Sequence, residues 1–91
     1  MRYELRAAAD HFLASLKAER DVSPHTLNAY RSDLEQFTEW SARGHLSDIR
    51  KLDRRHLRRY VSYLVERRYA RRTIARKVSG VKSVKNDMRL R

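Results

Sequence analysis

The chain has 91 residues, no cysteine, and 22 lysines and arginines against 11 aspartates and glutamates, which gives a net charge of +11. This length suits one small domain that buries about 60% of its unfolded surface, and it excludes a second domain. The lack of cysteine excludes a disulfide framework and a thiolate zinc site, and no apolar run approaches the ~20 residues that cross a bilayer. We therefore expect a single cytoplasmic domain over residues 1–91, with no membrane partner, whose positive charge attracts polyanions.

The segment from Glu4 to Arg20 contains neither glycine nor proline. Its apolar residues recur at steps of three and four and fall on one side of a helix, whereas its other side is mixed in charge. The pattern predicts a first helix that packs one face on the core.

A second helix is predicted to begin at Ser23 and Pro24. A serine hydroxyl can accept a hydrogen bond from a free amide of the first turn, and proline suits that turn because its missing N–H is not needed there. Apolar residues then recur at helical spacing until Gly44, so the helix is expected to end near Arg43. Asp33 and the glutamates that follow it are expected to make the distal surface of this helix acidic.

The first turns of this second helix are rich in polar side chains. A helix N-terminus presents free amides and a partial positive charge of roughly half a unit, which suits a phosphate. An ordinary capped turn with solvated side chains is the alternative interpretation. The candidate contacts are His25, Thr26, Asn28 and Arg31.

After a connection over residues 45–52, Asp53 is predicted to cap a third helix that runs to about Arg68. Four arginines occupy its first two turns, where cations oppose the helix dipole by roughly 0.3 to 1 kcal/mol each. A bound anion would explain them, and arginines that extend into water are the alternative. They are Arg54, Arg55, Arg58 and Arg59.

The fourth predicted helix covers Ala70 to Met88 and combines an apolar stripe with a cationic flank. Ile74, Val78 and Val81 recur at helical spacing. The cations predicted to lie off this stripe are Arg72, Arg76, Lys77, Lys82 and Lys85. Because no segment alternates as a β-strand does, we expect an all-α fold, a compact bundle of four helices.

The charge is concentrated in the second half of the chain. Residues 1–48 carry a net charge of −2, whereas residues 49–91 carry +13. Disordered basic tails also concentrate charge, but they lack the apolar periodicity that this half contains throughout. The sequence therefore predicts a folded basic surface.

No pattern of an active site is present. The chain has no glycine-rich phosphate loop and no His-Glu-x-x-His motif, and its four histidines lack the short paired spacing of metal ligands. Tyr30 and Tyr60 lie in apolar stripes, and the other three tyrosines have no neighbouring base, so structural roles are expected for all five. We expect no catalytic residue, no cofactor and no metal site.

Two motifs occur in order along the chain. Residues 12–40, FLASLKAERDVSPHTLNAYRSDLEQFTEW, contain S-x-x-T-x-x-x-Y-x-x-D-L-x-x-F, and residues 71–83 read RRTIARKVSGVKS. Together they resemble the core-binding, SAM-like N-terminal domain of tyrosine recombinases, the Xer and phage-integrase group. The chain departs from that family after Ser83, where Val84 and Lys85 stand in place of an aromatic pair.

The resemblance implies one half of a C-shaped clamp around duplex DNA, with the second and fourth helices across the major groove. Thr26, Arg72 and Thr73 are then assigned to phosphates. Asn28, Arg76 and Lys77 are assigned to base edges. The full set implied at the DNA is His25, Thr26, Asn28, Arg31, Arg72, Thr73, Arg76 and Lys77.

In that family the cleaving chemistry belongs to a separate catalytic domain with a nucleophilic tyrosine. The resemblance implies that this chain is not an enzyme by itself, that a catalytic domain accompanies it in a parent protein, and that recombinase copies self-associate on DNA. A small basic RNA-binding or ribosome-associated protein is the alternative, although few exposed aromatics are expected for stacking on bases. A helical domain with an acidic protein partner is a third possibility.

Overall fold

The computed structural model describes residues 4–44 and 46–89, which form four α-helices and one short 3₁₀ helix. The predicted all-α bundle of four helices is confirmed, and the one β pairing in these ranges is an isolated bridge between Glu4 and Asp48. The elements are α1 (Leu5–Glu19), α2 (Pro24–Arg43), η1 (Ile49–Lys51), α3 (Arg54–Glu66) and α4 (Arg71–Arg89).

Side-chain caps fix where the first three helices begin. Glu4 accepts hydrogen bonds from the first-turn amides of α1, and the hydroxyl of Ser23 accepts one from the amide of Thr26 at 3.2 Å. A carboxylate oxygen of Asp53 accepts one from the amide of His56 at 3.0 Å. These caps bind first-turn amides that have no partner within the helix, so each cap marks the residue at which its helix starts. The predicted starts of α2 and α3 are therefore confirmed.

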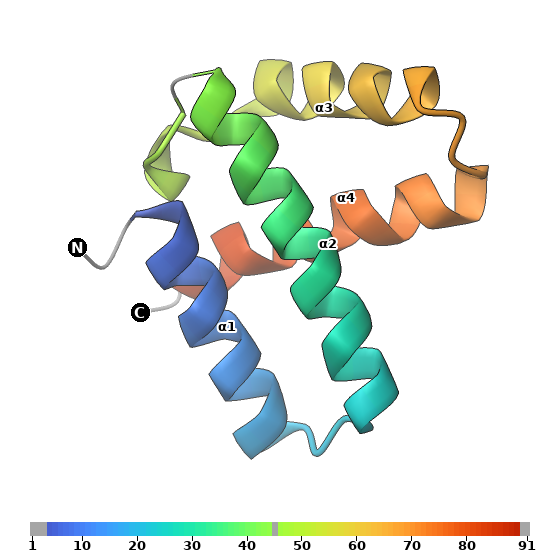
Figure 1. Ribbon diagram of the computed structural model, residues 1–91. Helices are drawn as coiled ribbons and strands as arrows, with labels where there is room; N and C mark the ends of the chain where they lie inside the picture. The colour runs from blue at the N-terminus through green and yellow to red at the C-terminus, as the bar shows by residue number, and fades with distance from the viewer. Residues whose placement is uncertain (1–3, 45, 90–91) are drawn as a thin grey trace.

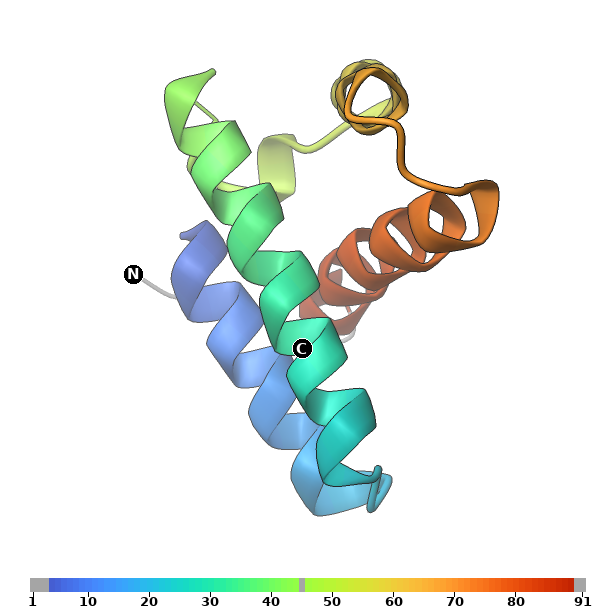
Figure 2. The ribbon, with the colours of Figure 1, turned by 45° about the vertical axis from the view of Figure 1, so that its right-hand side comes forward.

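The helices are arranged as two pairs. Figure 1 shows α1 and α2 side by side and antiparallel, with α4 passing behind α2. Figure 2, turned by 45°, places α4 on one side of the α1–α2 pair, with α3 above α4 and seen nearly end-on. Because α4 packs against α1, α2 and α3, it contacts every other helix of the bundle.

The core is formed by apolar side chains from every element. An aromatic cluster at its centre joins α2 to α3: the ring of Tyr60 lies 4.9 Å from that of Phe37 and 5.0 Å from that of Trp40, measured between centroids. Each such pair contributes roughly 0.5–1.5 kcal/mol beyond the area it buries. Val84 and Met88 are also buried, so α4 keeps its packing past the point where the family motif lapses.

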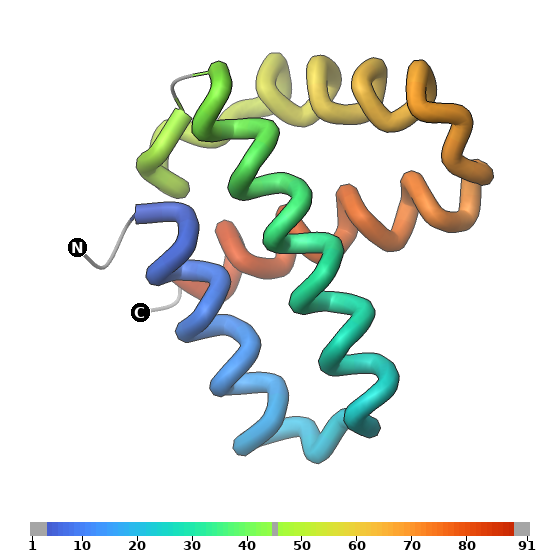
Figure 3. The backbone as a smooth tube through the Cα atoms, viewed as in Figure 1, coloured from blue at the N-terminus to red at the C-terminus, as the bar shows by residue number. Residues whose placement is uncertain are grey.

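The turn from α3 to α4 contains a strained residue, Arg68, whose φ is +64°. The amide of Arg68 donates to the carbonyl of Val65 at 2.9 Å, and that of Tyr69 donates to the carbonyl of Leu64 at 3.4 Å. This pair of bonds is the Schellman motif, which ends α3 at Glu66 rather than near Arg68 as predicted. The path of the turn can be followed in the tube of Figure 3.

Replacing Arg68 by glycine is expected to stabilise the domain. A left-handed conformation costs an L-residue roughly 1–2 kcal/mol, and glycine adopts it without that strain but loses more backbone entropy on folding. We expect Arg68→Gly to raise the free energy of unfolding by about 0.5–1 kcal/mol, measured by urea denaturation. Arg67→Gly, at the adjacent position with negative φ, is the control and should destabilise; equal effects at both positions would contradict this account of the turn.

The hydroxyl of Tyr60 lies in the core without a protein hydrogen-bond partner among the described residues. Its burial, and secondarily the negative charge of Asp33, raise the pKa of Tyr60 above its ordinary value of 10.0. The phenol is therefore kept neutral in the folded state at a pH where it ionises in the unfolded chain. A buried polar group that makes no hydrogen bond destabilises the fold.

Tyr60→Phe is expected to be neutral or stabilising at pH 7, by up to about 1 kcal/mol, because it removes only the unpaired hydroxyl. The pKa of Tyr60 is higher in the folded state than in the unfolded chain. The free energy of unfolding is therefore unaffected while the pH is below the unfolded pKa, and it falls as the pH rises above about 10, because only the unfolded chain then ionises. The advantage of the variant should therefore grow between pH 9 and pH 11 in parallel thermal melts of variant and parent. A destabilised variant whose deficit does not change with pH would show that the hydroxyl has a partner.

Candidate nucleic-acid interface

The first turns of α2 present polar side chains around the helix start. His25, Thr26 and Asn28 are exposed, and no acidic residue lies in the first turn. The hydroxyl of Ser23 donates to that of Thr26 at 3.0 Å, so cap and first turn are held together. Arg31 donates through Nη1 to the amide oxygen of Asn28 at 3.1 Å, which leaves the Asn28 amide nitrogen as a donor toward solvent.

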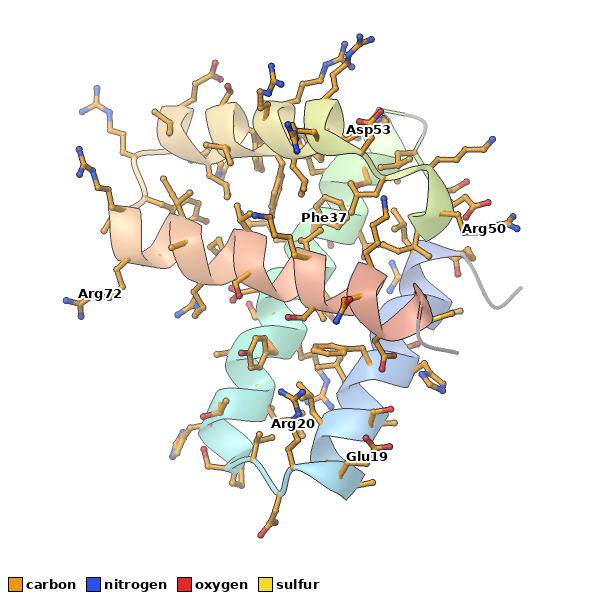
Figure 4. All side chains as sticks on the ribbon, turned by 180° about the vertical axis from the view of Figure 1, so that it is seen from behind. Glu19, Arg20, Phe37, Arg50, Asp53 and Arg72 are labelled. Carbon is orange, nitrogen blue, oxygen red and sulfur yellow. The ribbon has the colours of Figure 1, made fainter. Side chains whose placement is uncertain are left out.

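The N-terminal half of α4 presents cations. Arg72 and Arg76 are exposed and Thr73 is half-buried. Figure 4 shows Arg72 extending away from the start of α4. Because 100° separates successive residues of a helix, Arg72 and Arg76 lie on the same outer face, opposite the buried Val81.

The same outer face continues beyond the segment that the motifs indicate. Stepping along α4 by three and four residues from Arg76 reaches Ser79 and Ser83, and Lys82 lies beside them. Ser79 and Lys82 are exposed and Ser83 is half-buried. Lys82 belongs to the predicted cationic flank, whereas Ser79 and Ser83 were not predicted, although the helical spacing from Arg76 indicates both.

The two helix segments are joined by a buried carboxylate, Asp33 of α2, with only 2% of its surface exposed. One oxygen accepts from Nε of Arg76 at 2.8 Å, and the other accepts from Nη2 of Arg76 at 3.0 Å and from Nζ of Lys77 at 2.9 Å. The hydrogen bonds that Arg76 donates to Asp33 raise the pKa of Arg76. Two cations of α4 are thus fixed on one carboxylate of α2.

Two sequence predictions are wrong at this point. Asp33 does not belong to an acidic outer surface of α2, because the helix turns it toward α4. Lys77 does not lie on the cationic flank: only 7% of its side chain is exposed, and its ammonium lies between Asp33 and the ring of Tyr69, 4.9 Å from the ring centroid. Its charge is held inside the domain, so it is not available to a nucleic acid, whereas the side chain of Arg76 is 49% exposed.

Lys85 also departs from the predicted flank. It is half-buried, and its ammonium donates to the main-chain carbonyl of Leu52, which ties α4 to the segment before α3. The four arginines at the start of α3 are exposed, as a solvated or anion-binding turn requires. These arginines lie on α3, whereas the polar and cationic side chains described above lie on α2 and α4.

The described residues offer no metal-binding group. Within residues 4–44 and 46–89, no three histidine or acidic side chains gather closely enough to hold an ion. A hollow of about 470 Å³ between α3 and α4 is lined by apolar residues, serines, an asparagine and two lysines, without a carboxylate or imidazole. None of the helices in this part of the chain is long and apolar enough to cross a membrane.

Comparison with known proteins gives a consistent set of relatives. Residues 9–86 match the family model described as phage integrase, N-terminal SAM-like domain. The chain is 39% identical over 72 residues to the tyrosine recombinase XerC of Staphylococcus saprophyticus, and this alignment covers 79% of the chain and 24% of the relative. It is 39% identical over 80 residues to that of Pseudomonas aeruginosa, covering 88% and 26%. It is 38% identical over 74 residues to that of Staphylococcus aureus, covering 81% and 24%.

The family model concerns an N-terminal domain, and the relatives are matched over only part of their length. It spans about a quarter of the length of the curated relatives that it matches. No solved structure gives a significant match.

Asp33→Asn is expected to lower the free energy of unfolding by about 3–5 kcal/mol, because it leaves the buried ammonium of Lys77 without a counter-charge. Urea denaturation at pH 7 measures the loss. Adding Lys77→Met to this variant removes the orphaned charge and should restore most of the stability.

Arg76→Gln is the matched control for this prediction. It should cost less than about 1 kcal/mol, because half of the Arg76 side chain is already in water and Asp33 keeps its bond to Lys77. A small loss in Asp33→Asn, or no recovery in the double variant, would mean that the carboxylate does not hold the helix crossing.

Proposed function

Because this chain belongs to the family of N-terminal SAM-like domains of phage integrases, we propose that it binds duplex DNA as the core-binding domain of a tyrosine recombinase. The observation that carries the proposal is the exposed cationic face of α4, a helix that Asp33 ties to α2 beyond the polar start of α2. Both segments belong to one rigid crossing held by Asp33. Arginine and lysine on one face of a folded domain are the electrostatic footprint of a nucleic-acid binder.

The contacts divide by chemistry. We assign Thr26, Arg72 and Thr73 to phosphates, because hydroxyls, guanidinium groups and helix N-termini contact the backbone without reading sequence. Asn28 and Arg76 are assigned to base edges, since an amide can pair with adenine and a guanidinium with guanine in the major groove.

The remaining residues complete the surface. His25 and Arg31 flank the α2 contacts as further donors, and Lys82 extends the phosphate-binding face along α4. Lys77 is left out of the interface because its ammonium is buried. Its ammonium group compensates the negative charge of Asp33.

The proposal also concerns the parent protein. The relatives of this chain are named tyrosine recombinases and are about three times its length. We propose that this domain positions DNA for a catalytic domain of that kind, which supplies the cleaving chemistry, and that recombinase copies associate on the DNA. The domain itself contributes binding rather than catalysis.

Binding to a 30-base-pair duplex is expected to weaken steeply with salt. Each neutralised phosphate releases counterions and contributes about −0.9 to the slope of log K against log salt concentration. Fluorescence anisotropy between 50 and 200 mM KCl measures this slope. Arg72→Ala should weaken binding to all sequences alike and make the slope shallower by about 0.9.

Arg50→Ala is the matched control, because Arg50 is exposed but lies on the opposite side of the molecule from Arg72 in Figure 4. It removes the same charge and should leave most of the affinity. Binding that ignores salt, or equal losses from both substitutions, would contradict the proposed surface. Stronger binding to a structured RNA than to the duplex at equal salt would contradict the assignment to DNA.

A further inference from the structure

We infer that Asp33 is a positioning residue for sequence recognition: it orients the guanidinium of Arg76 so that its free edge reads a guanine. This inference rests on the proposed function and goes beyond it, because it identifies a buried residue that does not touch DNA as a determinant of specificity. Arg76 keeps N–H donors that Asp33 does not use.

A guanidinium carries five N–H donors in a planar fork. Asp33 takes one from Nε and one from Nη2, on one edge of the plane. The hydrogen bonds described for Arg76 leave the Nη1–Nη2 edge unused, and the side chain is 49% exposed. That edge carries two parallel N–H groups, the donor pattern that O6 and N7 of guanine accept in the major groove.

Burial of the carboxylate makes this orientation rigid. Asp33 is 2% exposed, and both its oxygens accept hydrogen bonds from α4, so the carboxylate has no room to follow a moving guanidinium. An unrestrained arginine has many rotamers and loses that freedom when it binds. An arginine already held by its other edge loses less on binding, and it presents one plane to the DNA.

Lys77 allows the pairing of Asp33 with Arg76 to occur on a surface that binds a polyanion. A carboxylate behind Arg76 would by itself cancel the charge that attracts phosphates. The buried ammonium of Lys77 lies 2.9 Å from the same carboxylate, so the cluster of three groups keeps a net charge of +1. Asp33 can therefore orient Arg76 while the outer face of α4 stays cationic.

The test begins with selection of duplexes by the full 91-residue chain from a library with 20 randomised base pairs. The selected duplex is then prepared with guanine or 7-deazaguanine at each enriched guanine, since 7-deazaguanine lacks the N7 acceptor. We expect one guanine at which this exchange weakens binding by about 5- to 150-fold. Arg76→Lys, which keeps the charge but lacks the fork, should abolish that discrimination.

The decisive variant is Asp33→Asn combined with Lys77→Met, which leaves Arg76 in place and no buried charge unpaired. It should bind the duplex more weakly than the parent chain, because the crossing of α2 and α4 is loosened, and with a similar dependence on salt, while the effect of 7-deazaguanine falls to less than about twofold. Lys77→Met alone keeps the carboxylate and should keep the discrimination. Thermal melts of each variant establish that the binding data come from folded protein.

Two results would overturn the inference. One is full discrimination in folded Asp33→Asn, Lys77→Met protein; the other is full discrimination in Arg76→Lys, which removes the fork without disturbing the core. Either would leave DNA binding itself intact. Absence of duplex binding by the unaltered chain would instead overturn the proposed function on which the inference rests.

Discussion

The geometry of this domain depends on the buried carboxylate of Asp33. A charge in the interior is costly unless opposite charges and hydrogen bonds compensate it. Asp33 meets this requirement with two consecutive residues of α4, Arg76 and Lys77, and therefore accepts only one placement of that helix. Because α4 also packs on α1 and α3, the pair of cations fixes how the two halves of the bundle meet.

The crossing also determines what the surface can do. It sets α2 and α4 in a fixed relation, and the DNA-binding surface that we propose draws polar groups from both helices. The cations of the second half are distributed over both α3 and α4, but it is cations of α4 that bind the buried carboxylate of α2. The net charge alone indicates the class of partner. The helix crossing, in contrast, indicates which face of the domain we propose for binding that partner.

Most of the fold follows from local patterns in the sequence. Ser23 and Asp53 are helix caps whose hydrogen bonds involve residues only three positions away, so their role can be read without knowing the tertiary structure. The end of α3 is less readable, because Arg68 adopts a positive φ that usually belongs to glycine. The continuation of α4 past Ser83 follows from its apolar spacing, although the family motif lapses there.

The candidate site was only partly predictable, for a physical reason. Helical periodicity gives the face on which a side chain lies, but it does not reveal which polar groups meet where two helices cross. Asp33 lies among exposed acidic residues of α2, and Lys77 is one of several cations of α4, so the sequence alone offers no reason to pair them. Their burial is a property of the crossing and becomes visible only when both helices are placed.

The central claim is that the start of α2 and the outer face of α4 form one DNA-binding surface. Its most direct test is an amide NMR titration of the chain with a 30-base-pair duplex at two salt concentrations. The account predicts that the largest shifts gather at residues 25–31 of α2 and along the outer face of α4 from Arg72 to Ser83, and that they shrink as salt rises. Shifts confined to the arginine-rich start of α3, with α2 and α4 unchanged, would contradict it.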